Sequence, residues 1–192
     1  MAHKTRDAAY YQRLHDQPGK YQDNNWLLDE LDTLRTFGAK TILELGCGNG
    51  RFLAAAAPHF ERVYGCDWAK APNITAVLAK PNITFLRADL LQGMPPVEAD
   101  LVVSADFLEH LPPKELTHVL AKISRLSERQ FHKIACYDDG HSHLSVYRPA
   151  QWLALWRSVN PAIVLERHDS RPGRPDQPVA VFTAGRDSSI PA

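Results

Sequence analysis

The segment from Tyr137 to Ser145, YDDGHSHLS, gathers side chains that can take part in catalysis or metal binding. It contains Asp138, Asp139, His141 and His143. A histidine with a pKa near neutrality, oriented by a carboxylate, can remove the proton of an acceptor hydroxyl group. The same residues could instead supply metal ligands, because imidazole and carboxylate groups are common ones. A third interpretation is a polar turn, since Asp-Asp-Gly is a good turn sequence.

The elements that must position this segment begin at Thr41, where strand-like and helix-like patterns start to alternate. The expected strands are 41–46, 62–67, 83–89, 100–106, 131–137, 161–167 and 178–184, and the expected helices are 25–37, 51–57, 73–80, 113–128 and 149–159. This alternation predicts an α/β fold with right-handed crossovers and a mostly parallel sheet. The last two strands lack a helix between them and are expected to form an antiparallel hairpin across the turn-rich residues 169–177.

A chain of 192 residues suits one domain, which we assign to residues 25–192. Residues 1–24 are polar and form a separate lead-in or a lid. Tyr10, Tyr11 and Tyr21 could close such a lid over a site, or could be incidental aromatic residues of a tail. Arg167, Arg171 and Arg174 surround the final turn, which we expect to be solvated, although they could hold an anionic group.

A glycine-rich loop, ILELGCGNGRF, follows the first expected strand and carries Gly46, Gly48 and Gly50. Glycines there allow a tight turn and the close approach of a ligand to the backbone. Asp67 ends the second strand and could bind both hydroxyls of a ribose, or cap a turn. Asp89 ends the third strand and could accept a hydrogen bond from an adenine amino group. The sequence therefore predicts a nucleoside site at the carboxyl ends of the strands.

Two classes of cofactor match these positions. A nicotinamide dinucleotide favours the spacing G-x-G-x-x-G, but here the third glycine comes one residue earlier. Glu44 stands two residues before the first glycine, where its negative charge disfavours a pyrophosphate. An acidic loop is better suited to a cofactor that carries ammonium and sulfonium groups.

The ordered set ELGCGNG, CD, RADL and DLVVSADFLEHL resembles the motifs of the class I S-adenosylmethionine-dependent methyltransferases. The resemblance covers residues 25–184 and implies a Rossmann-like, doubly wound, seven-stranded sheet with a reversed final hairpin. It also implies S-adenosylmethionine as cofactor, with the loop lining its methionine part, Asp67 on the ribose, and Asp89 and Leu90 at the adenine. Trp68 would stack on the adenine or stand at the rim. The cofactor residues that the resemblance implies are Glu44, Gly46, Cys47, Gly48, Gly50, Asp67, Trp68, Asp89, Leu90 and Asp106.

For the acceptor, position after the fifth strand favours a catalytic base in YDDGHSHLS over a metal site, and no metal is expected. His143 is preferred slightly to His141, with Asp139 to orient it. His110 would lie near the transferred methyl group, although in many relatives this residue mainly packs a helix. The segment HLSVYRPAQWLALW resembles methyltransferases of sugar and surface-glycan biosynthesis. We therefore expect O-methylation of a small-molecule, sugar or glycan acceptor; the alternatives are an RNA or protein methyltransferase and a non-catalytic binding subunit.

The composition of the chain indicates which partners and which cellular compartment to expect. The chain has 22 basic and 22 acidic residues, which argues against a broad electrostatic contact with nucleic acid or membrane, though a local basic patch is compatible with it. The three cysteines are far apart in apolar runs and are expected to be reduced, as in the cytoplasm. No apolar run is long enough to cross a membrane. The acceptor pocket would be open, or completed by the N-terminal residues, a second copy or a partner subunit.

Overall fold

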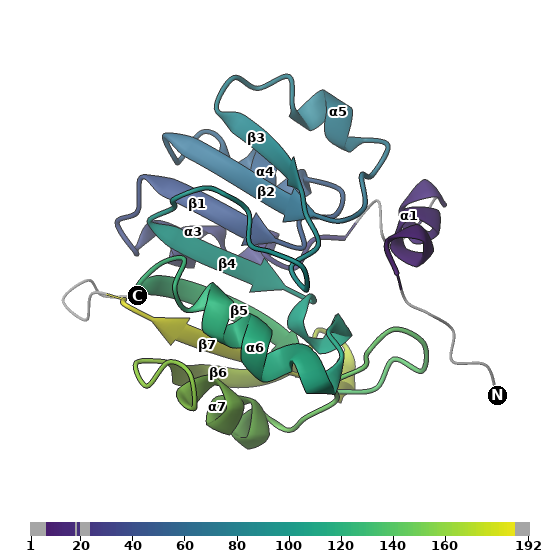
Figure 1. The fold of residues 1–192 in the computed structure, drawn as a ribbon, viewed down its shortest axis with the longest axis vertical. Helices are drawn as coiled ribbons and strands as arrows, with labels where there is room; N and C mark the ends of the chain where they lie inside the picture. Colours follow the sequence, from purple (N-terminus) through teal and green to yellow (C-terminus); the bar gives the residue numbers. More distant parts are fainter. Residues whose placement is uncertain (1–6, 18, 20–23, 187–192) are drawn as a thin grey trace.

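The computed structural model of the protein describes residues 7–17, 19 and 24–186. Its centre is a seven-stranded sheet in the order β3-β2-β1-β4-β5-β7-β6 (Figure 1). The strands are β1 Thr41–Leu45, β2 Arg62–Asp67, β3 Ile83–Arg87, β4 Leu101–Ala105, β5 Arg129–Ala135, β6 Val164–Arg171 and β7 Arg174–Ala184. Only β7 runs antiparallel to its neighbours. The prediction of a doubly wound, mostly parallel sheet with a C-terminal antiparallel hairpin is confirmed.

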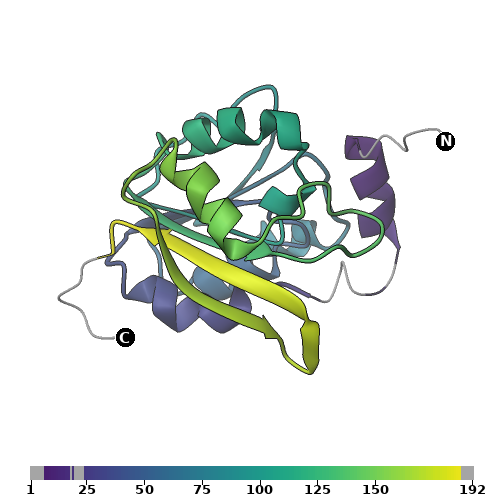
Figure 2. The ribbon, with the colours of Figure 1, turned by 90° about the horizontal axis from the view of Figure 1, so that it is seen from below.

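Helices cover both faces of the sheet, as Figure 2 shows from the β6 edge of the sheet: α6 and α7 lie on one face, and α3 and α4 lie on the other. The helices of the domain are η1 Leu28–Glu30, α3 Leu31–Arg35, α4 Arg51–Ala56, α5 Ile74–Val77, η2 Leu108–His110, α6 Pro113–Ile123 and α7 Pro149–Arg157. Here η marks a 3-10 helix. Pro113 and Pro149 each stand at the first helical position, where a missing N–H costs nothing.

The expected helix over 25–37 is wrong in its length. Asn25 begins a turn instead, because its side chain accepts a hydrogen bond from the backbone N–H of Leu27 at 2.9 Å. Only the 3-10 turn η1 and the short helix α3 follow. The expected helix over 73–80 likewise shortens to the single turn α5.

The final hairpin also differs from expectation. Residues 169–177 were expected to be an extended turn, but β6 runs to Arg171 and β7 begins at Arg174. The connection is therefore confined to Pro172 and Gly173. The backbone hydrogen bonds of the hairpin keep the flanking residues in the sheet, and the side chain of Arg171 at the end of β6 is buried and pairs with Asp106 after β4.

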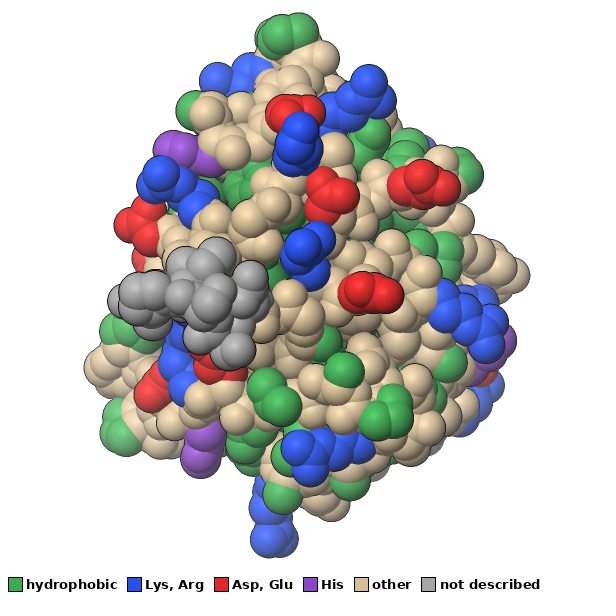
Figure 3. Space-filling model, turned by 90° about the vertical axis from the view of Figure 1, so that its left-hand side faces the viewer, with side chains coloured by type: hydrophobic (Ala, Val, Ile, Leu, Met, Phe, Trp, Pro, Cys, Tyr) green, Lys and Arg blue, Asp and Glu red, His purple; other side chains and the backbone are tan. Residues whose placement is uncertain are grey.

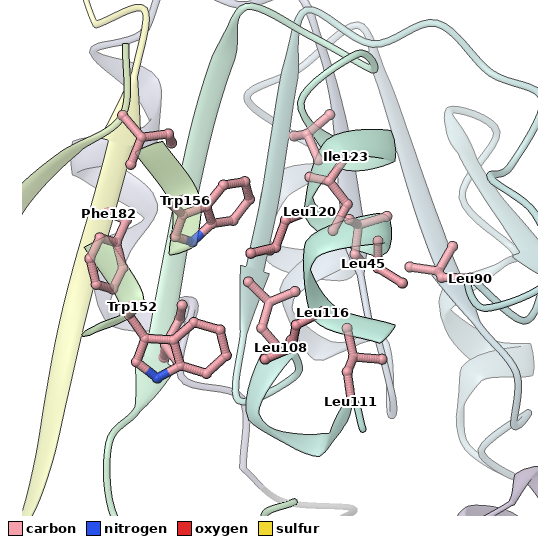
Figure 4. Close-up of a cluster of buried hydrophobic side chains, with 14 of the residues drawn as sticks. Leu45, Leu90, Leu108, Leu111, Leu116, Leu120, Ile123, Trp152, Trp156 and Phe182 are labelled. Atoms are coloured by element: carbon pink, nitrogen blue, oxygen red, sulfur yellow. The ribbon is translucent and has the colours of Figure 1, made fainter. Parts of the chain in front are cut away.

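The larger of two hydrophobic clusters fills the space between the sheet and the helices α6 and α7 (Figure 4). Trp152 and Trp156 of α7 and Phe182 of β7 are fully buried there. His132 of β5 stacks on Trp156 with ring centroids 4.7 Å apart, and its Nδ1 lies 2.9 Å from the hydroxyl of Ser104. Burial lowers the pKa of His132 to about 3. This rigid layer supports the carboxyl ends of β4 and β5.

The face at the amino ends of the parallel strands carries interspersed basic and acidic side chains (Figure 3). Such mixing accords with the zero formal charge of the chain. Within the described part of the chain, none of the helices combines the length and the apolar character needed to cross a membrane.

Candidate active site

A cavity of about 680 Å³ opens at the carboxyl ends of the parallel strands. The chain leaves β1 toward β2 and leaves β4 toward β5, so the cavity lies where the strand order reverses. Open α/β sheets bind their ligands at this point. We call one wall the glycine-loop half, formed by Gly46, Cys47, Gly48, Asp67, Trp68, Asp89 and Leu90. The opposite wall is the histidine half, formed by Asp106, His110, Tyr137, Asp139, His141, His143 and Arg171.

The glycine loop is shaped by close packing. Gly46 has a φ of 74°, a conformation that side chains rarely adopt, and a Cβ there would lie 2.6 Å from the ring of Phe107. Its N–H and that of Cys47 both donate to the carbonyl of Cys66. The loop therefore folds tightly against the end of β2 and presents backbone to the cavity.

Asp67 and Asp89 stand at the ends of β2 and β3, as the sequence predicted. The Asp67 carboxylate accepts hydrogen bonds from the backbone N–H groups of Gly48 and Ala69, both at 2.9 Å. Burial raises the pKa of Asp67, and these two bonds oppose that change. Asp89 accepts from the N–H of Leu91 at 2.9 Å. A carboxylate has about four acceptor sites, so Asp67 retains capacity to accept a hydrogen bond from a ligand.

Glu44 and Gly50 lie behind the cavity wall and do not line it. The Glu44 side chain is buried, and its Oε1 accepts a hydrogen bond from the Asn25 amide at 3.0 Å. Burial raises the pKa of Glu44 well above its usual value. Gly50 precedes the first residue of α4 and packs on Ile74. In this structure both residues support the loop from behind.

The N-terminal helix α1, Ala8–Asp16, stands apart from the sheet, beyond the carboxyl ends of its parallel strands (Figure 1). Tyr11 and His15 are buried beneath it and line the cavity. The Tyr11 ring stands 5.5 Å from Trp68 and 5.7 Å from His110 between centroids, so it touches both halves. Gln12 holds the helix down by donating to the Lys70 carbonyl at 2.8 Å and accepting from the Lys70 N–H at 2.9 Å. Tyr21 lies outside the described residues.

Asp106 and Arg171 form an ion pair between the end of β4 and the end of β6. Arg171 is only 5% exposed, and its guanidinium carbon lies 3.9 Å from the centroid of the Trp26 ring. The expectation of a solvated turn is therefore wrong for this arginine. Asp106 has a φ of 48°, and among the described residues it is the non-glycine residue with a positive φ. Such strain persists only where surrounding contacts enforce it, and here the ion pair does so.

Asp139 organises the loop after β5. Its Oδ1 accepts from the backbone N–H groups of His141, Ser142 and His143 at 2.7–3.0 Å, and its Oδ2 accepts from the Ser142 hydroxyl. Burial alone would raise the pKa of Asp139, but these hydrogen bonds hold it well below its usual range. Asp139 therefore holds the loop through hydrogen bonds that favour its charged form.

The two histidines of this loop lie in different surroundings. The side chain of His141 is 42% exposed, with its Nε2 3.2 Å from Asp139 and its Nδ1 3.4 Å from the Tyr10 hydroxyl. The side chain of His143 is 5% exposed. Its Nδ1 lies 2.5 Å from the Tyr137 carbonyl, and its ring packs edge to face on His110 with centroids 5.1 Å apart. The structure thus joins His143, not His141, to His110.

His110 and Glu109 end the 3-10 turn η2 after β4. His110 lines the cavity, and its Nδ1 lies 3.1 Å from the Ser142 carbonyl. Burial lowers the pKa of His110. Glu109 is fully buried and accepts the N–H of Ala135 at 3.1 Å. Burial, and after it the charge of Asp106, raises the pKa of Glu109 well above its usual value. Sequence reasoning passed over Glu109, although its position beside His110 could have drawn attention to it.

Residues 42–154 match the family model described as a methyltransferase domain. The match covers more than half of the chain, so the chain belongs to this family. The predictions of a methyltransferase, of its class I fold and of S-adenosylmethionine as cofactor are therefore confirmed.

Solved structures share the fold at low sequence identity. N-methyltransferase NodS of Bradyrhizobium japonicum WM9, in complex with S-adenosylhomocysteine, is 18% identical with a TM-score of 0.67, over 92% of this chain and 97% of that one. The 1,6-didemethyltoxoflavin-N1-methyltransferase of Burkholderia thailandensis is 17% identical with a TM-score of 0.72, over 93% and 86%. The N-terminal domain of EvdMO1, in the presence of D-fucose, is 18% identical with a TM-score of 0.61, over 93% and 96%. No curated protein sequence matches the chain.

Proposed function

We propose that the protein transfers a methyl group from S-adenosylmethionine to a hydroxyl oxygen of a polar small molecule, with a sugar-like acceptor as the first candidate. The observation that carries this proposal is the pair of cavity-lining histidines, His110 and His143, opposite the glycine loop. Weakly acidic hydroxyls need help to lose their proton, and imidazole groups are suited to this. The D-fucose of the EvdMO1 structure is a hydroxyl-rich molecule of this kind.

The residues of the glycine-loop half suit the cofactor. The cavity volume of about 680 Å³ lies within the usual range of roughly 300–1,000 Å³ for small-molecule sites. Asp67 would accept the two ribose hydroxyls and Asp89 the adenine amino group, beside Leu90. The backbone of Gly46, Cys47 and Gly48 would border the methionine part. Bound in this way, S-adenosylmethionine supplies a methyl group on a sulfonium sulfur.

The histidine half would bind the acceptor. Methyl transfer is a direct displacement, so orienting the acceptor oxygen in line with the methyl group is the main task of this wall. Both histidines direct Nδ1 at a backbone carbonyl, which can only accept, so the lone pair is left on Nε2. We propose that these Nε2 atoms activate the acceptor hydroxyl and that Asp139 acts indirectly by holding the loop.

The N-terminal helix would act as a lid. Tyr11 and His15 of α1 line the cavity, so α1 would have to move for ligands to exchange. We place the enzyme in the cytoplasm, because Cys47, Cys66 and Cys136 are free buried thiols that suit a reducing compartment. Completion of the pocket by a second copy or a partner subunit stays a prediction.

The test is methyl transfer from labelled S-adenosylmethionine to three panels: sugars and other polyols, small amines, and RNA. Label on an oxygen of the first panel supports the proposal, whereas label only on amine nitrogen or only on RNA contradicts it. The matched pair His143→Ala and His141→Ala decides between the two loop histidines. We expect His143→Ala to lower kcat by about 10²–10⁴-fold, the usual contribution of proton-transfer assistance, and to exceed the effect of His141→Ala.

A further inference from the structure

Three potential metal ligands meet where η2 and the loop after β5 pack together. A carboxylate oxygen of Glu109 and one ring nitrogen each of His110 and His143 all lie within 4.8 Å of one another. The Glu109 Oε1 lies 4.0 Å from the Nε2 of His143. The loop is tied to this turn, because the N–H groups of Leu144 and Ser145 both donate to the Glu109 carbonyl at 2.8 and 2.9 Å. The three groups are therefore held together by backbone as well as by side-chain packing.

Both histidines are oriented as metal ligands are. A ligating histidine commonly donates its other ring N–H to a carbonyl or carboxylate, which fixes the tautomer and the direction of the lone pair. His110 and His143 do this toward the carbonyls of Ser142 and Tyr137, at 3.1 and 2.5 Å. The Nε2 atoms are left as unprotonated nitrogen ligands.

Glu109 lacks a partner on one of its oxygens. The side chain is fully buried, its Oε1 accepts the Ala135 N–H, and its Oε2 is buried without a hydrogen-bond partner in the structure. A buried carboxylate needs compensation by a cation or by hydrogen bonds. The nearby guanidinium of Arg171 is paired with Asp106, and its charge only partly opposes the rise in the pKa of Glu109. A cation beside Glu109 would supply the missing partner.

We propose that Glu109, His110 and His143 bind a divalent transition-metal cation, and that the cation in turn binds the acceptor oxygen. This inference rests on the proposed function and replaces direct proton removal by the two imidazoles with activation of the hydroxyl by the cation that they hold. Two imidazoles and one carboxylate suit Zn²⁺, Co²⁺ or Mn²⁺, whereas Ca²⁺ and Mg²⁺ prefer oxygen ligands alone. Three protein ligands leave open positions, as in catalytic metal sites. Bonds of about 2.1 Å to one cation bring the ligand atoms to roughly 3 Å from one another. Metal binding therefore requires a small inward movement of the loop.

The cation changes how the acceptor loses its proton. An acceptor hydroxyl bound at an open position becomes more acidic, as metal-bound water does. Its proton passes to water, its oxygen forms the new bond to the methyl carbon, and the bond from that carbon to sulfur breaks. The products are the methyl ether, S-adenosylhomocysteine and one proton, so no oxidant or further reactant is required.

His141 is not part of this cluster and provides the control, whereas the Asp139 Oδ2 lies 3.9 Å from the Nε2 of His143 and holds the loop. His141 Nε2 faces Asp139 at 3.2 Å and the side chain is largely exposed. If His141 and His143 were both metal ligands, His141→Ala would weaken metal binding as much as His143→Ala.

The test titrates the chelator-treated full chain with Co²⁺ alone and follows the visible absorption of the ion. We expect one equivalent to bind, at least about a hundredfold more weakly in Glu109→Gln, His110→Asn and His143→Asn, and unchanged in His141→Ala. Affinity for S-adenosylhomocysteine shows that each variant is folded, and because three variants are compared, one that does not fold leaves two others. Stoichiometric binding that disappears in the folded ligand variants supports the site.

Absence of Co²⁺ binding, or binding that none of the folded ligand variants weakens, overturns the proposal. The assay of methyl transfer after chelation is read separately. Full transfer to a hydroxyl acceptor without metal leaves the proposed function intact and overturns the metal site. Tight Co²⁺ binding without transfer to any hydroxyl acceptor supports the metal site and overturns the proposed function.

Discussion

In the glycine-loop half of the cavity, the wall is formed by short segments that directly follow three strands, and their carboxylates accept hydrogen bonds from backbone N–H groups of the same or the neighbouring segment. In the histidine half, the wall joins η2, the loop after β5 and the end of β6, whose side chains come from distant parts of the chain. The first half depends on local backbone geometry and the second on long-range side-chain pairs. Substitutions should therefore affect ligand binding in the first and overall stability or chemistry in the second.

The largest effect is expected at the Asp106–Arg171 pair. Asp106→Ala leaves a guanidinium that is 3% exposed without its carboxylate, and breaking a buried pair in this way costs about 3–5 kcal/mol. The free energy of unfolding should fall by that amount in urea titrations. Asp169→Ala, on the exposed part of the same hairpin, is the matched control and should change it by no more than about 1 kcal/mol. If the two substitutions lowered the free energy of unfolding equally, the buried Asp106–Arg171 pair would contribute no more to stability than an exposed ion pair.

The next effect belongs to the glycine-loop half. Asp67→Ala should weaken the binding of S-adenosylhomocysteine by roughly 10- to 150-fold, the equivalent of about 1.5–3 kcal/mol for hydrogen bonds to a charged group. Isothermal titration calorimetry measures this change in affinity. The variant also loses the contacts of Asp67 to Gly48 and Ala69, so its unfolding is measured in parallel. Unchanged affinity in a folded variant would place the ribose elsewhere.

Acid should weaken the support of the histidine half through His132. The pKa of this buried histidine is lowered by desolvation from 6.5 to about 3, so between these values the unfolded chain binds the additional proton. Stability is therefore lost as pH falls below about 6.5. For this residue alone, the free energy of unfolding should drop by roughly 2 kcal/mol from pH 7 to pH 5.

The check is urea unfolding at both pH values for the unaltered chain and for His132→Gln, which does not titrate. The exposed helix residue His118, changed to Gln, is the control. An identical loss in the unaltered chain and in His132→Gln would show that other groups govern the acid response.

The smallest effect concerns the contact of α1 with the glycine-loop half. Gln12→Ala removes the two hydrogen bonds to the backbone of Lys70, each worth about 0.5–1.5 kcal/mol in general and less at this partly exposed position. We expect a two- to fivefold weaker affinity for S-adenosylhomocysteine, or about 0.5–1 kcal/mol. Arg13→Ala, exposed on the same helix, should leave it unchanged. Equal affinities for both variants would argue that α1 is no lid.

Much of the glycine-loop half could be predicted from the sequence, because its signals are local. A buried strand, closely spaced glycines and carboxylates at strand ends imply the same backbone arrangement wherever they occur in this order. Gly46, Gly48, Asp67 and Asp89 accordingly line one wall. Glu44 belonged to the same motif but is not among the residues that line the cavity; its side chain is buried against Asn25, a long-range contact that local spacing does not reveal.

The histidine half could be predicted only as a region. The place of YDDGHSHLS after the fifth strand located it at the cavity, but the choice between His141 and His143 was open. Burial separates them, and burial depends on how the loop folds onto η2. Arg171 was expected in solvent because proline and glycine surround it, yet strand pairing in the hairpin buries it beside Asp106.

The amino-acid sequence by itself determined the family, the order of the sheet elements and the glycine-loop wall. Hydrophobic periodicity and turn residues act over a few neighbouring positions, so they can be read without the fold. The tertiary structure alone decided that Glu109, His110 and His143 meet, that Arg171 pairs with Asp106 and that α1 covers the cavity. These contacts join residues far apart in the chain, and which of them form depends on the packing of the whole sheet and its helices.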